Sequence, residues 1–134
     1  MISFIVPAYN EETELPETLR AIHSAAVGYK FEIVLANDGS TDATAGIGEQ
    51  FGARVISIER RQIAAARNAG ARAARGDIFI FVDADTRIGP EHVRGATNAL
   101  EKGFAGRQPS RLRWRNSTVG QSNVPCFQRA LLWT

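Results

Sequence analysis

The sequence has few of the features that mark secreted, disulfide-linked or membrane-spanning proteins. It holds one cysteine, Cys126, which excludes an internal disulfide framework and a cysteine-rich metal site. The longest strictly apolar run near its middle, residues 78–82, is too short to span a bilayer. No basic leader precedes the first apolar run, so we expect no signal peptide. We therefore expect a cytoplasmic protein, which could also associate peripherally with a membrane.

Acidic residues are absent from the end of the chain. Residues 1–106 carry 11 Lys and Arg against 14 Asp and Glu, a net charge of −3, whereas residues 107–134 carry five arginines and no acid, a net charge of +5. The body therefore lacks the basic surface that binding to nucleic acid requires, and we expect no nucleic acid partner. We also expect residues 107–134 to be an atypical basic tail.

The remaining composition is that of one globular domain. The chain has 134 residues, of which 44% are hydrophobic and 22% charged, and a chain of this length buries roughly two thirds of its unfolded surface. Short β-rich apolar runs predict strands at residues 2–6, 31–36, 54–58 and 78–82. Helical spacing predicts helices at residues 13–26, from the turn at 37–41 to about 51, at 63–75 and at 90–102. This alternation predicts an α/β fold with right-handed crossovers and a mostly parallel sheet.

Polar clusters follow three of the predicted strands, at the point where each strand ends. They are residues 8–11, residues 37–39 and residues 83–85. The carboxyl ends of parallel strands lie at one edge of the sheet, and ligands bind at that edge. We therefore expect these loops to converge on one binding site.

The turn Asp83-Ala84-Asp85 brings two carboxylates to the end of a buried strand. Hard cations such as Mg²⁺ and Mn²⁺ bind oxygen ligands, commonly one or two carboxylates together with substrate phosphates. A metal at this turn would make a diphosphate a better leaving group. The alternative is that an Asp merely caps the turn.

Asp38 and Arg67 are the other candidate ligand-binding residues. Asp38 ends a strand and could accept hydrogen bonds from a nucleobase or a ribose; the alternative is an Asx-turn with helix capping by Ser40 or Thr41. Arg67 could contact the base or the diphosphate. Its alternative is a solvated helix face, shared with the other arginines of this region, Arg60, Arg61, Arg72 and Arg75.

Two other nucleotide-binding classes fit less well. Gly46-Ile47-Gly48 gives part of a dinucleotide-binding motif, but Phe51 takes the position of the third glycine, and the glycines do not follow the first strand. Nucleotidyltransferases have a glycine-rich basic loop after the first strand, whereas the loop at residues 8–12 is acidic.

Four segments together resemble the family 2 glycosyltransferases in their order and spacing. They are Ile5-Val6-Pro7-Ala8-Tyr9-Asn10-Glu11, Asn37-Asp38-Gly39-Ser40-Thr41-Asp42, Ala66-Arg67-Asn68-Ala69-Gly70 and the run from Gly76 to Asp85. The resemblance covers residues 1 to about 106. It implies a GT-A fold, with a Rossmann-like sheet in three α/β/α layers, truncated after the Asp-x-Asp half. It also implies inverting transfer from a nucleotide-diphosphate sugar with Mn²⁺ or Mg²⁺. We expect a UDP-sugar first and a GDP-sugar second.

The resemblance also implies a role for each matching residue. The base pocket would be lined by Pro7, Ala8 and Tyr9, and Glu11 would lie near the ribose. Asp38 would read the base, with Arg67 beside it. Asp83 and Ala84 would touch the ribose and the diphosphate. Asp85 would be the principal metal ligand, with Asp83 as the second. Asn37 stands where an acid is commoner, which we expect to matter little.

The end of the chain departs from the family pattern. Family members continue into an acceptor-binding half whose acidic residue deprotonates the acceptor, and residues 107–134 contain no acid. The general base is therefore unknown, and we expect sugar transfer by this chain to be absent or very slow. The alternative function is a non-catalytic nucleotide-binding or assembly module. A missing half would expose apolar surface that a homo-oligomer could cover.

Overall fold

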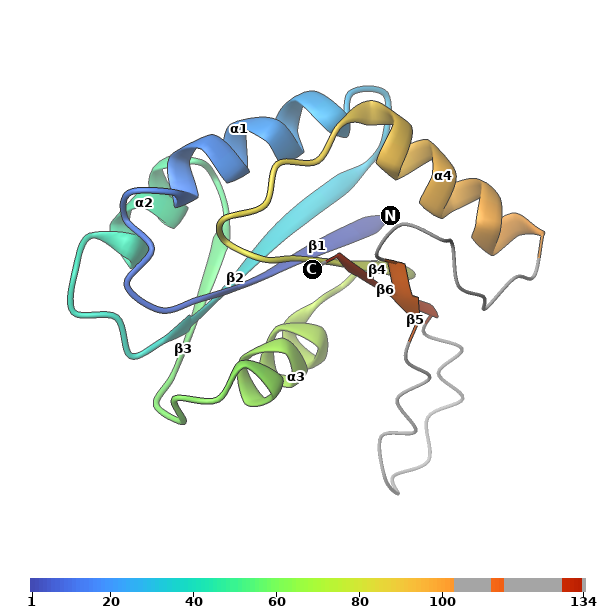
Figure 1. Cartoon of the computed structure of the whole chain (residues 1–134). Helices are drawn as coiled ribbons and strands as arrows, with labels where there is room; N and C mark the ends of the chain where they lie inside the picture. The colour runs from blue at the N-terminus through green and yellow to red at the C-terminus, as the bar shows by residue number, and fades with distance from the viewer. Residues whose placement is uncertain (103–111, 115–128, 134) are drawn as a thin grey trace, which may run out of the picture.

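The computed structural model describes residues 1–102, 112–114 and 129–133. Within them one sheet has the strand order β3-β2-β1-β4-β6-β5 (Figure 1). The strands are β1 (Ile2–Ala8), β2 (Phe31–Asp38), β3 (Arg54–Ile58), β4 (Ile78–Val82), β5 (Leu112–Trp114) and β6 (Arg129–Trp133). Strand β5 is antiparallel to β6, and the other neighbouring pairs are parallel. The prediction of a mostly parallel sheet is confirmed.

Four helices cover the two faces of the sheet in the described part of the chain. They are α1 (Leu15–Ala25), α2 (Thr44–Gln50), α3 (Ile63–Ala73) and α4 (Pro90–Glu101). Helices α1, α2 and α4 lie on one face and α3 on the other, which confirms the three α/β/α layers (Figure 1). None of the helices among the described residues has the length and apolar character that crossing a bilayer requires.

The central strands are apolar because both of their faces are covered. Every residue of β1 is buried, as expected for a parallel strand between two helical layers. Adjacent residues of a strand point to opposite faces, so Phe4 belongs to the larger core cluster beneath α1 and α4, whereas Ile5 belongs to a smaller cluster. That smaller cluster contains Phe79 and Phe81 and packs against Ala71 of α3 and Ala74 just after it.

The boundaries differ from the predicted ones at the functional edge. Strand β1 extends to Ala8 and β2 to Asp38, so both strands end in residues of the predicted site. Helix α2 begins only at Thr44. Asp42, expected in its first turn, therefore precedes the helix, and its carboxylate accepts hydrogen bonds from the N–H and hydroxyl of Thr44.

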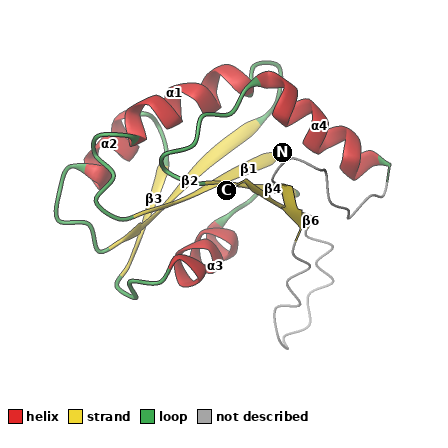
Figure 2. Cartoon of the chain, in the orientation of Figure 1, coloured by secondary structure: helices red, strands yellow, loops and turns green. Residues whose placement is uncertain are grey.

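The loops after β1, β2 and β4 gather at one end of the sheet, away from the N-terminus (Figure 2). This is the carboxyl edge of the parallel strands, where the sequence predicted a site. Cys126 and most of the basic tail lie outside the described residues.

Candidate nucleotide-sugar site

A pocket of about 370 Å³ opens at this carboxyl edge. Such a volume lies within the range of small-molecule sites. The end of β1, the end of β2 and the segment that enters α3 line it, through Pro7, Ala8, Tyr9, Glu11, Asp38, Arg61, Gln62, Ile63 and Ala66. The structure thus brings together five of the nine predicted nucleotide-sugar-binding residues.

Asp38 lies at the floor of this arrangement and is only 4% exposed. One carboxylate oxygen accepts hydrogen bonds from the N–H groups of Arg60 and Arg61 at 2.8 and 3.0 Å, and the other accepts one from Gln62 at 2.9 Å. Successive N–H groups around a residue with left-handed φ form a concave anion-binding arrangement, and Arg61 has φ 50°. A carboxylate offers about four acceptor positions, and these three bonds occupy three of them.

The charge state of Asp38 follows from these contacts. Burial acts to raise the pKa of Asp38, but the three backbone N–H groups and the charge of Arg61 outweigh it, and the pKa lies below its ordinary value. Asp38 is therefore an anionic acceptor at neutral pH. The alternative interpretation, an Asx-turn at Asp38, names the wrong residue. The Asx-type contact is made by Asn37, whose side-chain oxygen accepts the N–H of Ser40.

Ser40 and Thr41 bond to the first loop instead of capping α2. The hydroxyl of Ser40 accepts the N–H of Asn10 at 3.0 Å, and the side-chain oxygen of Asn10 accepts the N–H of Thr41 at 2.8 Å. The N–H of Glu11 donates to the hydroxyl of Thr44 at 2.9 Å. These bonds tie the loops after β1 and β2 together, and they fix the segment that carries the pocket residues Tyr9 and Glu11.

Arg61 is the main pocket residue that sequence reasoning missed. Its guanidinium lies 4.0 Å from the ring centroid of Tyr9, in a cation–π contact. Gln62, Ile63 and Ala66 were missed as well. They could have been predicted from their position. The segment follows β3, and the carboxyl end of β3 reaches the same edge of the sheet as the carboxyl ends of β1 and β2.

Arg67 does not lie on a solvated helix face, which was the alternative interpretation of this residue. Arg60, Arg61, Arg72 and Arg75 are exposed, whereas the side chain of Arg67 is 20% exposed and donates to Asp83 at 2.7 Å. Arg67 thus meets the first carboxylate of the Asp83-Ala84-Asp85 turn, and its neighbour Ala66 lines the pocket. The Nε of Arg67 is buried without a hydrogen-bond partner among the described residues.

The pKa of Glu11 reflects the charges of several nearby carboxylates. Burial raises the pKa of Glu11, and the charges of Asp85, Glu14, Asp42 and Asp83 raise it further, in that order. Glu11, which lines the pocket, therefore lies within electrostatic reach of both acids of the turn. A divalent cation would relieve this repulsion.

Asp85 is the carboxylate best suited to hold that cation. It is exposed and forms no ion pair with a described residue, whereas Asp83 is paired with Arg67. Among the described residues no three His, Cys, Asp or Glu are grouped to hold a metal. One or two carboxylates completed by phosphate oxygens is the usual arrangement for Mg²⁺, so the residues present fit a metal that arrives with a diphosphate.

The fold and this edge define an α/β domain of the GT-A class, on which a small-molecule pocket adjoins an acidic turn. Residues 3–130 match glycosyl transferase family 2, and the chain belongs to that family. The match continues past residue 106, where the sequence analysis placed the end of the resemblance.

Named relatives agree with this assignment. The chain is 34% identical over 157 aligned positions to an undecaprenyl-phosphate 4-deoxy-4-formamido-L-arabinose transferase of Pseudomonas fluorescens, covering 96% of this chain and 46% of that protein. The aligned segment thus spans less than half the length of the curated relatives, from 28% to 46% of each.

Two solved structures show the same fold with ligands. Glucosyl-3-phosphoglycerate synthase from Mycobacterium tuberculosis, in complex with Mn²⁺ and UDP-glucose, superposes with a TM-score of 0.64 at 27% identity, over 84% of this chain and 42% of that one. A mannosyltransferase from Pyrobaculum calidifontis, in complex with GDP-mannose and Mn²⁺, gives a TM-score of 0.66 at 26% identity, over 82% of this chain and 33% of that one.

Proposed function

We propose that this chain is the donor-binding half of a glycosyltransferase that transfers a sugar from a nucleotide-diphosphate sugar with a divalent metal. One observation carries the proposal. The pocket that contains Asp38 and the turn that contains Asp85 lie at the same sheet edge, and Glu11 lines the former within electrostatic reach of the latter. The bound states of the two similar structures support the same ligand class.

The base would occupy the pocket beside Tyr9, with Pro7 and Ala8 along its wall. The remaining acceptor position of Asp38 would take an N–H donor of the base, and Glu11 would lie near the ribose. The ribose and the diphosphate would then run toward the 83–85 turn, where Ala84 and the Arg67–Asp83 pair lie.

Asp85 would hold the metal, with Asp83 as a second carboxylate. A bound Mn²⁺ or Mg²⁺ supplies charge neutralisation for the diphosphate leaving group. The ion pair with Arg67 already offsets the charge of Asp83, so we assign the larger part of the metal affinity to Asp85.

Calorimetry with UDP and GDP, each in Mn²⁺ and in chelator, tests this proposal. We expect UDP to bind more tightly with the metal, with GDP as the second candidate. Asp85→Asn should remove most of the gain from the metal, because it removes the charge of the principal ligand. A matched control is Asp77→Asn, the same change at an exposed carboxylate that pairs with the N-terminus, before β4. Equal affinity for every nucleotide in metal and in chelator would contradict the proposal.

A non-catalytic nucleotide-binding or assembly module is the alternative function. Residues 107–134 contain no acid, so we assign no general base to them. Turnover assays with a sugar acceptor and with undecaprenyl phosphate separate the alternatives, since the latter is named for the Pseudomonas relative. For a lipid acceptor we propose that the protein acts at the cytoplasmic surface of a membrane, as a peripheral protein. Efficient transfer to either acceptor would exclude the non-catalytic module.

A further inference from the structure

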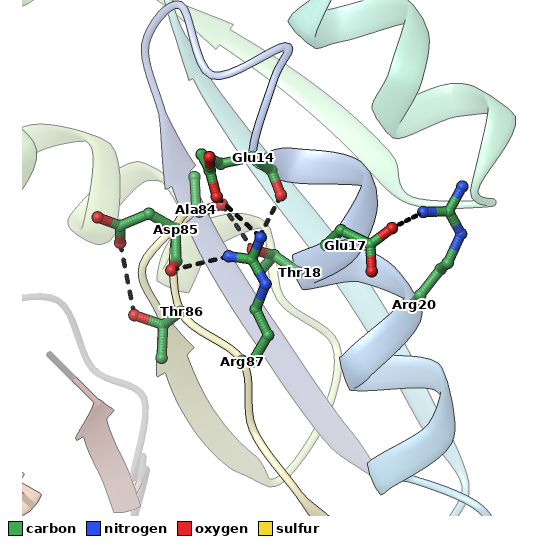
Figure 3. Close-up of polar contacts among 8 residues, drawn as sticks. All are labelled: Glu14, Glu17, Thr18, Arg20, Ala84, Asp85, Thr86 and Arg87. Carbon is green, nitrogen blue, oxygen red and sulfur yellow. Dashed lines mark hydrogen bonds and ion pairs between the residues drawn. The ribbon is translucent and has the colours of Figure 1, made fainter.

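Helix α1 contacts the Asp83-Ala84-Asp85 turn directly, and Glu14, just before the helix, is linked to the turn through Arg87 (Figure 3). Thr18 reaches Ala84, and Arg87 connects Asp85 to Glu14. None of these three side chains lines the pocket. The contacts fall on the backbone of the turn, which leaves the carboxylates of the two acids to other partners.

The Thr18 contact is fully buried. Its hydroxyl donates to the carbonyl of Ala84 at 2.6 Å, and it lies 3.3 Å from the carbonyl of Glu14. A hydroxyl has one proton to donate, and the shorter contact identifies Ala84 as its acceptor. The 66 positions between these two residues make the contact a tertiary link between α1 and the middle residue of the turn.

Arg87 holds the next carbonyl of the turn. One of its terminal nitrogens donates to the backbone oxygen of Asp85 at 3.0 Å, and the other donates to the carboxylate of Glu14 at 2.8 Å. The planar guanidinium fixes the angle between these two bonds. Figure 3 shows that the carboxylate of Asp85 points away from Arg87, so the backbone bond leaves that carboxylate accessible.

We propose that Thr18, Glu14 and Arg87 are positioning residues that fix the backbone of the Asp83-Ala84-Asp85 turn and thereby set its affinity for a divalent metal bound with a nucleotide diphosphate. The inference rests on the proposed function. Groups that orient a metal ligand from behind typically change metal affinity by about 10–100-fold when they are removed.

The Glu14–Arg87 ion pair is exposed, so its loss can test the positioning role without a large change in the stability of the fold. The side chains of Glu14 and Arg87 are 47% and 43% exposed, and pairs this exposed contribute little to folding. The loss of Arg87 should therefore leave the fold intact. It also removes a positive charge near the turn, which by electrostatics alone would strengthen the binding of a cation. If Arg87→Gln binds the metal more weakly, the change in charge cannot be the cause. The cause would then be that the backbone of the turn is no longer held in position.

The experiment compares the gain that Mn²⁺ gives to UDP binding in the wild type, Arg87→Gln, Arg87→Lys, Thr18→Val and Thr18→Ser. We expect Arg87→Gln and Thr18→Val to lower this gain by about tenfold, with UDP affinity in chelator unchanged. Thr18→Ser should restore most of it, because it keeps the hydroxyl. Arg87→Lys should restore only part, because an ammonium lacks the planar fork.

The same helix provides a matched control. Glu17 and Arg20 form an exposed ion pair on α1 that does not touch the turn (Figure 3). Glu17→Gln should leave the gain from Mn²⁺ unchanged. An equal loss in Glu17→Gln, or no loss in Arg87→Gln, would overturn the inference.

Amide exchange separates failure of this inference from failure of the proposed function. The N–H of Thr86 donates to the carbonyl of Asp83 at 2.9 Å and reports on the turn without any ligand. We expect it to exchange faster in Arg87→Gln than in the wild type or Glu17→Gln. Unchanged exchange would overturn the positioning role whether or not UDP binds. If Mn²⁺ gives the wild type no gain in binding either UDP or GDP, the proposed function fails, whereas faster exchange of the Thr86 N–H in Arg87→Gln would still show that Arg87 fixes the turn.

Discussion

At the scale of single residues, Asp38 combines a structural and a ligand-binding task. Its carboxylate holds the N–H groups of Arg60, Arg61 and Gln62, and the same residues then bring Arg61 over the ring of Tyr9. The pocket wall therefore depends on Asp38, for which the sequence predicted a role in reading the base, or else an Asx-turn, and not the contacts with residues 60–62. A substitution of Asp38 should disturb both tasks, and ligands of different size distinguish them.

Asp38→Ala should weaken the binding of UDP by on the order of 1–3 kcal/mol, because a base donor loses its acceptor. Pyrophosphate, which has no base, should lose less. Calorimetry with both ligands measures the difference. Asp42→Ala is the control, because Asp42, in the neighbouring loop, bonds to Thr44 at the start of α2 and does not line the pocket. If UDP and pyrophosphate lose the same free energy, Asp38 acts through the 60–62 segment alone.

At the scale of elements, α3 packs close to the sheet, and this packing places two residues of the candidate site. Ala66 and Gly70 are its buried residues, one turn apart. A Cβ on Gly70 would overlap the Cγ2 of Ile5 in β1. The small residues of α3 thus permit a close helix–sheet approach, which places Ala66 in the pocket wall and Arg67 on Asp83.

Gly70→Ala should destabilise the fold by about 1–3 kcal/mol, because the added methyl group overfills the contact between α3 and β1. Denaturant unfolding measures this change. Gly95→Ala in α4 is the matched control, because nothing lies within 4 Å of its added Cβ, and alanine in an open helical position should stabilise by up to about 1 kcal/mol. Destabilisation of the same size at both positions would show that packing against Ile5 is not the cause.

At the scale of the whole molecule, a polar network connects several elements at the amino ends of the parallel strands. The side chain of Glu32 in β2 is 17% exposed and accepts hydrogen bonds from the hydroxyl of Ser3 and the guanidinium of Arg54. It also accepts the N–H of Arg75, just beyond α3. One carboxylate thereby connects β1, β3 and the end of α3, at the edge opposite the candidate site.

This network predicts how stability depends on pH. Burial acts to raise the pKa of Glu32, but the hydrogen bonds from Ser3, Arg75 and Arg54 outweigh it and lower the pKa. A depressed carboxyl pKa contributes stability above its ordinary pKa, and that stability is lost as the pH falls through the folded-state value. Glu32→Gln should therefore unfold more easily at neutral pH, by about 1–3 kcal/mol, and should lose less stability below about pH 5.

Denaturant unfolding over this pH range measures the difference between Glu32→Gln and the wild type. Glu17→Gln, at an exposed carboxylate of α1, controls for the loss of one negative charge. If the free energy of unfolding of Glu32→Gln falls with decreasing pH as much as that of the wild type, the Glu32 carboxylate is not the cause of the loss of stability in acid.

Much of the fold could be read from local patterns. The run at residues 78–82 and the helical spacing of Leu15, Leu19 and Ile22 depend on near neighbours, and the structure confirms the strand and the helix they predicted. The shared edge also followed, because parallel strands bring their carboxyl ends together. Helix α2 was predicted too early, because Asp42 binds Thr44 from outside the helix.

The sequence by itself determined the α/β class and the edge where the candidate site lies, since the periodicity of each segment and the alternation of strands and helices along the chain are local features. Only the tertiary structure decided which groups meet there. The contact of Thr18 with Ala84 joins residues 66 positions apart, and that of Arg67 with Asp83 joins residues 16 apart. No local pattern specifies such pairs, because they depend on how α1 and α3 pack on opposite faces of the sheet. The same packing brings Arg61 over Tyr9 and closes the 60–62 segment on Asp38.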